Sequence, residues 1–470
     1  MQLVWFRQDL RLVDHPALSA AVRQARQQNQ TVEAVFIISR AQWRRHQMAQ
    51  VRERFLLARL NELGAVLAEL GIRLHRLEVD WFDEVPAALA ALVQARGARA
   101  LHAISAIEVD ERRRDAAVSR QLSVPCHFVP GCCVLPPGSV LTGKGEAFKV
   151  FTPFSRAWLK ALAAQGSTVL PPPGPVAAPL GWQPMSLPRP TALEARVLAD
   201  WPVVEGAAEA RLTQFLERAV LDYESQRDLP AREGTARLSA YLAAGILSPR
   251  QCLAALQQRL GRLPFSRGEP GFAWLNELIW REFYRHLLVL EPRLSMDQPF
   301  QLHTRALAWR QDEAAFAAWC QGRTGYPIVD AAMRCLNQTG WMHNRLRMIV
   351  ASFLTKDLHL SWRQGEDYFM SRLVDGDLAA NNGGWQWAAG TGADAAPYFR
   401  VFNPTTQGQR FDPKGDFIRR WLPELAAVPD AYLHTPHDWL RIKGLRDYPA
   451  PMVDHALARQ QAIAMFQQLE

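Results

Sequence analysis

Short apolar runs alternate with stretches of helical periodicity along the first 130 residues, and this alternation constrains the fold more than any other feature. Residues 49–70 and 83–96 carry the helical periodicity, and Gly71 and Gly97 stand where those helices would end. Strands that alternate with helices pair in parallel, because each helix returns the chain to the same end of the sheet. We therefore predict a Rossmann-like, doubly wound α/β domain over residues 1–130. Its strands are expected at Leu3–Phe6, Val32–Ile38, Leu74–Val79, Ala100–Ile107 and Cys126–Val129.

A proline-rich stretch separates this region from the rest of the chain. Eight of the twenty residues 171–190 are proline, which fixes the backbone and removes hydrogen-bond donors. We expect a connector over residues 131–206 that is Pro-rich and extended at 166–200. Helical periodicity dominates from 207 to 470, which predicts a large all-α domain. Its main helices are expected at 208–221, 235–245, 249–260, 272–290, 327–338, 344–358 and 365–373.

Charge and cysteine usage narrow the class of protein. The formal net charge of +8 favours a polyanionic partner, with nucleic acid as the first candidate. The six cysteines are sparse and form no C-x-x-C motif, which is typical of reduced thiols. The opening MQLVWFRQDLRL is too charged for a signal peptide, and no apolar run approaches the ~18 residues of a membrane span. We expect a soluble, cytoplasmic protein with no membrane partner.

Several familiar motifs lack the context that their chemistry needs. Gly138–Gly145 resembles a P-loop, but Gly145 stands where a hydroxyl would hold Mg²⁺. No buried strand precedes Gly390-x-Gly392, as a dinucleotide-binding motif requires. His434 and His437 have no further ligands near them in the sequence, so no metal site is predicted.

The segment Glu233–Ser239 is interpreted as a helix start that holds an anion. Gly234 and Thr235 suit the beginning of a helix, and Arg237 would add charge to the free backbone N–H groups there. A pyrophosphate would fit such a site. The alternative is an ordinary capped helix with a surface arginine.

The segment from Trp274 to Arg285 combines aromatic and charged side chains on one helical face. Such a face suits a pocket that stacks flat rings and offers one acid better than it suits a core. The side chains that share this face at helical spacing are Trp274, Glu277, Trp280, Arg281 and Tyr284.

Two later segments add polar groups. A helix is expected to begin after Gly340, and it would carry Asn344, Arg345 and Arg347. The Asp-Gly-Asp sequence 375–377 would either bind a metal or pair with an arginine such as Arg347. Asn381 follows with an amide that hydrogen-bonds without titrating.

Together these segments resemble the photolyase/cryptochrome family, and they are most similar to its bacterial members that act on cyclobutane pyrimidine dimers. The resemblance extends over almost the whole chain, and a long ordered set of specific strings rarely arises by chance. The strings are LVWFRQDLRL at the start, KVFTPFSRAWLK, EGTARLSAYLAAG, WLNELIWREFYRHL, QGRTGYPIVDAAMR, GWMHNRLRM, DGDLAANNGGWQWAAGTGADAAPYFR and FNPTTQG.

The resemblance implies FAD held in the helical domain, with the reduced anion as the active form. Thr235–Ser239 would take the phosphates, the Arg347–Asp375 pair would lie beside the isoalloxazine, and Asn381 would face its N5 atom. The positions that match the family's flavin contacts are Tyr223, Thr235, Ala236, Arg237, Leu238, Ser239, Trp274, Trp341, Arg347, Asp375, Gly376, Asp377 and Asn381.

The resemblance also implies a carbon–carbon lyase driven by light, in which the excited reduced flavin lends an electron to a dimer flipped out of the DNA. Glu277 would hydrogen-bond the dimer, Asn344 and Met348 would contact it, and Trp280 and Trp387 would stack against it. The positions that match the family's DNA contacts are Arg227, Glu277, Trp280, Arg281, Tyr284, Asn344, Arg345, Trp387, Arg400 and Thr406. Those that match its tryptophan relay to the flavin are Trp309, Trp362 and Trp385.

A second, light-harvesting chromophore is implied for the N-terminal domain, and methenyltetrahydrofolate is the expectation. Asp110 and Glu111 stand where the folate-binding branch typically has Asn-Glu, and Met296 and Asp297 stand where it can carry Cys-Lys. One side of the pocket is therefore altered, and a deazaflavin or flavin antenna is the alternative.

Three other functions compete with dimer repair. A photosensory cryptochrome often has a C-terminal extension, whereas this sequence ends soon after its last helical segment and keeps Glu277, Asn344 and Met348. A photolyase for (6-4) photoproducts would use a histidine pair, where this chain has Trp341-Met342-His343-Asn344. An α/β nucleotide-binding protein with a helical partner domain would leave the clustered Trp and Arg residues without a purpose. A monomer is expected by resemblance.

Overall fold

The computed structural model describes residues 1–182 and 197–469. The chain forms two compact units. The first comprises Met1–Leu221 and Ala236–Ser295, and the second comprises Asp222–Thr235 and the chain from Met296 onward. Each unit is described in turn.

The first unit contains a parallel five-stranded sheet in the order β3-β2-β1-β4-β5. Strand β1 lies at its centre, where Val4 pairs with Ala34 on one side and with His102 on the other. All residues of β1, β2 and β4 are buried, as expected for strands covered on both faces. The strands are β1 (Gln2–Phe6), β2 (Val32–Ser39), β3 (Arg73–Val79), β4 (Ala100–Ile104) and β5 (Cys126–Val129).

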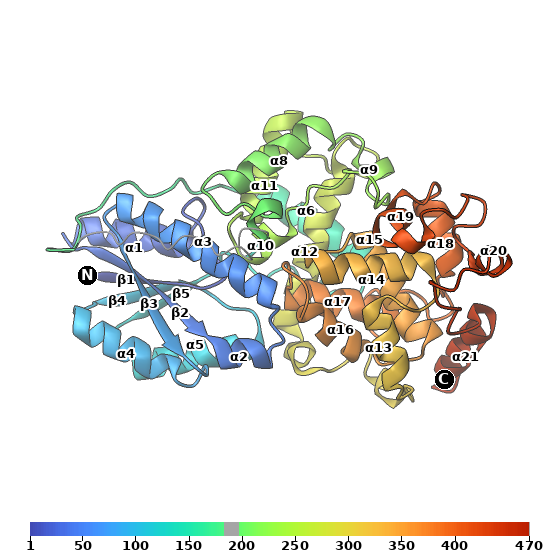
Figure 1. Cartoon of the computed structure of the whole chain (residues 1–470). Coiled ribbons are helices and arrows are strands. Elements are labelled where there is room, and N and C mark those ends of the chain that lie inside the picture. Colours follow the sequence, from blue (N-terminus) through green and yellow to red (C-terminus); the bar gives the residue numbers. More distant parts are fainter. Residues whose placement is uncertain (183–196, 470) are drawn as a thin grey trace. The chain divides into compact units, whose positions relative to one another are not determined.

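Helices cover both faces of this sheet, so the predicted doubly wound α/β fold is confirmed. Helices α1 (Pro16–Gln27) and α3 (Gln50–Glu69) lie on one side, and α4 (Val85–Arg96) and α5 (Val109–Gln121) lie on the other (Figure 1). The short α2 (Arg40–Arg45) follows β2 directly. Gly97 ends α4 at φ 61°, the left-handed conformation that its position in the sequence predicts.

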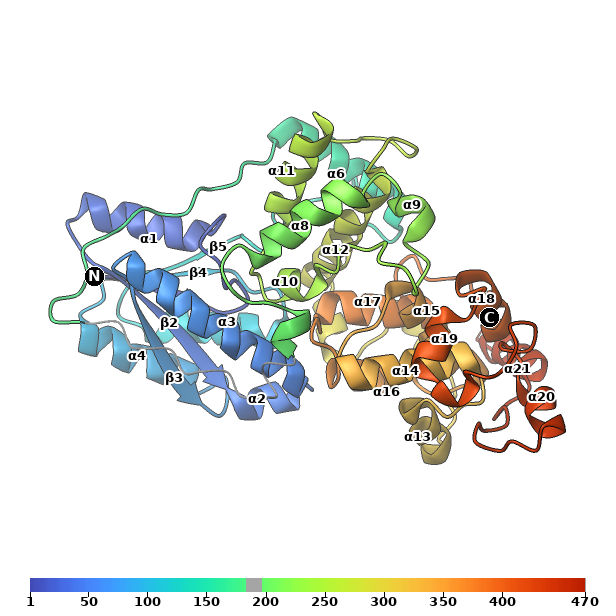
Figure 2. The same ribbon diagram turned by 45° about the horizontal axis from the view of Figure 1, so that its top comes forward.

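The remaining helices of the first unit follow the sheet region in sequence (Figure 2). Helix α12 packs against α6, and α11 packs against α8. The match between prediction and structure is close for α11 and α12, whose bounds are those expected. The helices are α6 (Phe151–Gln165), α8 (Ala207–Arg218), α10 (Ser239–Ala243), α11 (Pro249–Leu260) and α12 (Phe272–Leu290).

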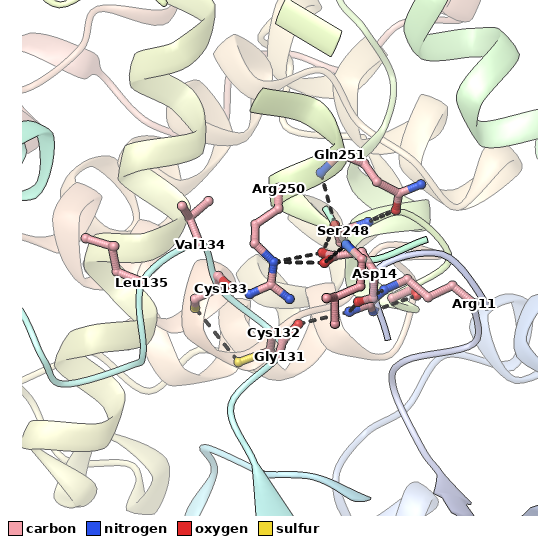
Figure 3. A network of polar contacts seen from close by, with 12 residues as sticks. Arg11, Asp14, Gly131, Cys132, Cys133, Val134, Leu135, Ser248, Arg250 and Gln251 are labelled. Carbon is pink, nitrogen blue, oxygen red and sulfur yellow. Dashed lines mark hydrogen bonds and ion pairs between the residues drawn. The ribbon is translucent and has the colours of Figure 1, made fainter. Parts of the chain in front are cut away.

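The division into units does not coincide with the predicted boundaries at 130 and 206. A polar network explains why the helices after 206 group with the sheet (Figure 3). Asp14 accepts hydrogen bonds from Ser248 and from Arg250 Nε, and Arg11 donates to the carbonyls of Gly131 and Gly245. The predicted connector also contains α6. Its stretch 166–182 is without strands or α-helices, and residues 183–196 of the predicted Pro-rich stretch lie outside the described residues.

Two predicted elements are shorter in the structure. The strand expected to reach Ile107 ends at Ile104. The helix expected over 235–245 covers only Ser239–Ala243, because Arg237 has a left-handed backbone (φ 47°) that an α-helix cannot include.

The second unit is helical among its described residues, as predicted. Its core centres on α14, α15 and α17, with Trp319, Met333 and Trp385 among the buried side chains. None of the helices described for the chain has the length and apolar character that crossing a membrane requires. The elements are α9 (Tyr223–Gln226), η1 (Pro292–Met296, which begins in the first unit), η2 (Leu302–Ala306), α13 (Glu313–Gln321), α14 (Pro327–Thr339), α15 (Asn344–Ser352), η3 (Phe353–Asp357), α16 (Trp362–Met370), α17 (Leu378–Ala389), α18 (Pro404–Phe411), α19 (Asp416–Trp421), η4 (Pro423–Leu425), α20 (His437–Ile442) and α21 (His455–Gln467).

Candidate flavin and DNA site

Helix α12 carries two glutamates, Glu282 and Glu277, that differ in burial. Glu282 is fully buried and accepts hydrogen bonds from Val134 N (2.6 Å), Leu135 N (3.3 Å) and Trp158 Nε1 (3.0 Å). Burial raises the pKa of this carboxyl although the three donors oppose the shift. Glu282 was not predicted, since its donors come from distant parts of the chain. Its hydrogen bonds attach α12 to the segment at Val134 and Leu135 and to Trp158 of α6. Glu277, three residues after Trp274 on the same helix, is half-buried.

The aromatic residues of α12 are held by ring contacts. Trp280 stacks on Phe151 of α6 with ring centroids 3.6 Å apart and planes 4° apart, and it also contacts Tyr284 at 5.6 Å. Trp274 is buried against Phe215 of α8 at 5.3 Å. One face of the Trp280 ring is therefore already covered within this unit, so only its other face is available to stack on a base.

Arg281 is bound to backbone carbonyls of its own unit. Its guanidinium donates to Cys132 O (2.9 Å) and Leu242 O (3.3 Å). These bonds use two of the five N–H groups of the guanidinium and fix its position, while the phosphate contact stays a prediction.

The segment that was predicted to hold a pyrophosphate is not a helix N-terminus. Residues 236–238 precede α10, which has only five residues, so the predicted helix start at Gly234 and Thr235 is wrong. The Arg237 guanidinium lies over the Trp201 ring at 5.3 Å, and Arg237 O accepts from Arg211 Nη1 at 3.4 Å. Leu238 and Ala236 are buried and Ser239 is exposed in this unit. Tyr223, buried at the start of α9, and Thr235 belong to the second unit.

An ion pair joins α15 to the loop before α17 in the second unit. Arg347 Nη2 donates to Asp375 Oδ2 at 2.7 Å, and Arg347 Nε donates to Met342 O at 2.8 Å. The Asp375 side chain is 2% exposed, and its Oδ1 atom has no hydrogen-bond partner among the described residues. A buried carboxylate oxygen without a donor is costly, so this oxygen is suited to an N–H or O–H group of a bound molecule. The predicted pairing of Arg347 with Asp375 is present.

The first turn of α17 orients two asparagines and an aspartate. Asp377 caps the helix by accepting from Ala380 N at 3.0 Å. Asn381 is buried and its Nδ2 donates to Glu366 O at 3.0 Å, which leaves its amide oxygen as the other polar atom. The neighbouring Asn382 Nδ2 donates to Glu366 Oε1 at 2.9 Å.

Glu366 supports this turn and was missed in the sequence. It lies on α16, so nothing in its local pattern relates it to Asn381 and Asn382. Burial raises its pKa to about 8, against the opposing hydrogen bond from Asn382. The carboxyl is therefore largely protonated at neutral pH.

Asn344 and Met348 meet one turn apart on α15. Asn344 Nδ2 lies 4.0 Å from Met348 Sδ, and Asn344 is exposed. His343 caps the helix by accepting from Arg345 N at 3.2 Å, and burial lowers the pKa of His343 to about 4, which keeps the accepting nitrogen unprotonated. Trp341 precedes this cap with its ring 6.4 Å from that of His343.

The candidate DNA-binding residues of the second unit differ in burial and in their contacts with other side chains. Arg345 forms a two-point ion pair with Asp228 (2.7 and 3.1 Å) and lies over the Phe411 ring. This pairing neutralises its charge and favours a structural role. Trp387 is half-buried, 6.4 Å from the ring of Phe402. Arg400 and Thr406 are exposed, and Arg227 at the end of α9 is half-buried.

The three tryptophans of the predicted relay lie in the same unit and differ in burial. Trp385 on α17 and Trp362 on α16 are 2% and 1% exposed, while Trp309 is only partly buried against the same core. Two members of the predicted relay are therefore in the interior and one lies nearer the surface. Trp385 also contacts Phe369 at 4.9 Å and Trp319 at 6.0 Å.

The predicted antenna residues, Asp110 and Glu111, both lie close to the imidazole of His46. His46 Nε2 lies 3.2 Å from Asp110 Oδ2, and His46 Nδ1 lies 3.6 Å from Glu111 Oε1. Burial is the main cause that raises the pKa of Glu111 to about 7, and the negative charge of the nearby Glu108 adds to the shift. His46 was missed because it lies 64 residues before Asp110. Within residues 1–182 and 197–469, no three His, Cys, Asp or Glu side chains gather as a metal would require.

Solved structures with the same fold define the class of this protein. A crystal structure of a bacterial class III photolyase from Agrobacterium tumefaciens matches with a TM-score of 0.85 and 35% identity, over 99% of this chain and 97% of that one. The crystal structure of a Synechocystis sp. PCC6803 cryptochrome matches with a TM-score of 0.87 and 26% identity, over 99% of both chains. The parallel α/β sheet and the helical second unit thus place this protein in the photolyase/cryptochrome class.

Sequence comparison narrows the class to one family. Residues 2–176 match the DNA photolyase family, and residues 274–468 match the FAD binding domain of DNA photolyase. Proteins named deoxyribodipyrimidine photo-lyase from Salmonella typhimurium and Escherichia coli are each 50% identical, over 99% of this chain and 98% of theirs. The chain belongs to the DNA photolyase family, and the resemblance, the enzyme class and the FAD cofactor expected from the sequence are confirmed.

Proposed function

We propose that this protein repairs cyclobutane pyrimidine dimers in DNA with light. The observation that carries the proposal is the 50% identity, over nearly the whole chain, to proteins named deoxyribodipyrimidine photo-lyase. The basic charge of +8 suits a DNA substrate. FAD, when bound and reduced, supplies an electron to the dimer under light and accepts it back.

The second unit holds groups that suit the flavin. Asp375 Oδ1 is a buried acceptor that lacks a donor among the described residues, and Arg347 balances the charge of this carboxylate. Asn381 Nδ2 donates one of its two N–H groups to Glu366 O, and its amide oxygen would accept a hydrogen bond from the N5–H of reduced flavin. An amide at this position holds the ring without providing an acid.

The remaining flavin contacts are proposed from the resemblance. Arg237, Tyr223 and Trp274 carry charge or aromatic surface suited to phosphates and flat rings. Residues 236–238 would bind phosphate through a non-helical backbone, since α10 begins only at Ser239. The full set proposed to hold FAD is Tyr223, Thr235, Ala236, Arg237, Leu238, Ser239, Trp274, Trp341, Arg347, Asp375, Gly376, Asp377 and Asn381.

The dimer would be recognised by polar and apolar side chains together. Glu277 would hydrogen-bond the dimer and steady the charge that develops on it, while Asn344 and Met348, which lie 4.0 Å apart, would contact its bases. The open face of Trp280 and the ring of Trp387 would stack on the flipped bases. Arg227, Arg400 and Thr406 would contact the DNA backbone. Arg281, Tyr284 and Arg345 would contribute to the same DNA surface, where Arg281 is held by backbone carbonyls and Arg345 by Asp228.

An antenna chromophore is proposed for the α/β domain. Asp110 and Glu111 with His46 offer two carboxyls and an imidazole, which would hydrogen-bond the pterin ring of methenyltetrahydrofolate. Near-UV absorption and fluorescence of the purified protein would test for this chromophore. We further propose that the protein acts as a monomer in the cytoplasm.

The test is light-dependent repair of an oligonucleotide that carries one cyclobutane thymine dimer, using the purified and reduced holoenzyme. Restored thymines only under near-UV or blue light are expected, with dark and (6-4)-lesion controls unrepaired. No repair despite bound reduced FAD would overturn the proposal. Repair of the (6-4) control alone would assign the other lesion, and repair of neither would favour a photosensory cryptochrome.

A further inference from the structure

Two adjacent cysteines lie in the segment between β5 and α6, and no part of the proposed repair reaction uses them. The Sγ atoms of Cys132 and Cys133 are 3.8 Å apart, and both thiols are free (Figure 3). Cys133 is 2% exposed, whereas Cys132 is only partly buried. Cys132 is thus the more exposed residue of the two.

The segment around these thiols is fixed by arginines on other elements. Arg281 Nη1 donates to Cys132 O at 2.9 Å, Arg250 Nη1 donates to Cys133 O at 3.1 Å, and Arg11 Nη2 donates to Gly131 O at 3.0 Å. These carbonyl contacts hold the backbone of the segment in the conformation that places the two Sγ atoms 3.8 Å apart.

The charges near the pair make its two thiols unequal. The hydrogen bond between the thiols, followed by the charges of Arg285 and Arg281, lowers the pKa of Cys132 to about 6, although burial and Glu108 oppose this shift. Burial raises the pKa of Cys133 well above its usual value. Cys132 is therefore the nucleophile and Cys133 the thiol that reacts second.

We propose that Cys132 and Cys133 form a reversible dithiol–disulfide site that hydrogen peroxide oxidises. The Cys132 sulfur attacks one peroxide oxygen, the O–O bond breaks, and water leaves with the thiol proton, which gives a sulfenic acid. The Cys133 sulfur then attacks the Cys132 sulfur, the S–O bond breaks, and a second water leaves. Two thiols lose two electrons and two protons, and one peroxide becomes two waters.

The adjacency of the two residues makes this disulfide easy to reduce. Neighbouring Cα atoms lie about 3.8 Å apart, below the lower limit of about 4.4 Å for ordinary disulfides. A strained disulfide of this kind belongs to the labile class that thiol reductants reopen. Closing the ring also rotates the peptide between Cys132 and Cys133, which would weaken the carbonyl bonds to Arg281 and Arg250.

The test treats the purified holoenzyme with hydrogen peroxide in the dark, blocks remaining thiols with iodoacetamide, and measures the masses of the cysteine peptides. We expect the peptide with residues 121–144 to lose two hydrogen atoms and to keep one alkylated thiol. Dithiothreitol should restore all three alkylations. The matched control is Cys126→Ser, which removes the third thiol of this peptide and should leave the disulfide unchanged.

Other outcomes would overturn the proposal. Cys132→Ser should reduce peroxide-dependent loss of Cys133 alkylation at least tenfold, and an unchanged loss would exclude Cys132 as the nucleophile. Sulfinic acid on Cys132 without a disulfide, a disulfide between two chains, or a pair that stays reduced while Cys320 oxidises would each contradict it. If the Cys132→Ser variant fails to fold, the mass measurement on the wild-type protein still shows whether the Cys132–Cys133 disulfide forms. This measurement does not depend on repair activity.

Discussion

Gly365 on α16 lies directly against the indole ring of Trp385 on α17. A Cβ atom at residue 365 would overlap three ring carbons of this tryptophan. Residue 365 is in the middle of a helix, so no unusual backbone angle requires glycine there. Glycine is needed because the ring of Trp385, the innermost residue of the proposed relay, occupies the space of a side chain.

Gly365→Ala should therefore disturb both stability and the environment of Trp385. The added methyl forces the ring to move, and overpacking of this kind costs about 1–3 kcal/mol. We expect a lower free energy of unfolding in urea and a changed near-UV circular dichroism spectrum.

The matched control is Gly384→Ala on α17, because a Cβ at residue 384 meets no atom within 4 Å. There, replacement of a helical glycine should be neutral or stabilise the protein by up to about 1 kcal/mol. Equal effects of the two substitutions would show that the contact with Trp385 is unimportant.

Asp375→Asn should weaken FAD binding. The substitution removes the negative charge that pairs with Arg347 at 2.7 Å. It also changes the carboxylate whose buried Oδ1 atom has no hydrogen-bond donor among the described residues. We expect the dissociation constant of FAD, measured by flavin fluorescence on adding FAD to the apoprotein, to rise at least tenfold, or about 1.4 kcal/mol.

Glu424→Gln is the control for Asp375→Asn, since it breaks an ion pair of the same length, 2.7 Å to Arg334, elsewhere in the same unit, with a carboxylate that is more exposed (17% against 2%). This variant should bind FAD as the wild type does. An unchanged FAD affinity of Asp375→Asn, in a protein that still unfolds cooperatively, would refute the assignment of the pair to the flavin.

Much of the fold could be predicted because its signals are local. The alternation of strands and helices predicts the parallel sheet, and the periodicity at 249–260 and 272–290 gives α11 and α12 with their observed bounds. Arg237 shows where this fails. A non-glycine residue in the left-handed conformation has no reliable sequence signal, so the expected helix start is four residues too early.

The contacts that modify the candidate site are mostly long-range. Arg281 finds its carbonyl partner 149 residues away, and Arg345 finds Asp228 117 residues away. A motif therefore identifies these arginines as basic but does not reveal which partners in the fold hold their guanidinium groups. Glu366 and His46 were missed for the same reason, since each acts through a residue on another element.

Trp309→Phe should block photoreduction of oxidised flavin but spare repair by enzyme that has been reduced chemically. Trp309 is the partly buried member of the proposed relay, while Trp362 and Trp385 are 1% and 2% exposed. We expect the rate of flavin photoreduction with an external thiol to fall at least tenfold, as followed by the loss of flavin absorbance. Trp421→Phe, which changes another partly buried tryptophan on the same core, serves as control. Loss of repair by the pre-reduced Trp309→Phe enzyme would contradict a role confined to the relay.

Glu366→Gln should change how stability depends on pH. The folded-state pKa of Glu366 is about 8, against 4.5 for an ordinary glutamate, because burial disfavours its charged form. Between these values the folded protein binds a proton that the unfolded chain does not, so this carboxyl makes wild-type stability fall as pH rises from 4.5 to 8.

Glutamine mimics the protonated acid and can still accept from Asn382, so both proteins should be similar at pH 5. At pH 8 the variant should be more stable, by on the order of 3–4 kcal/mol. Urea unfolding at both pH values measures this difference. A variant that is less stable than the wild type at pH 8 would mean that Glu366 is ionised in the folded protein and that its charge stabilises the turn carrying Asn381.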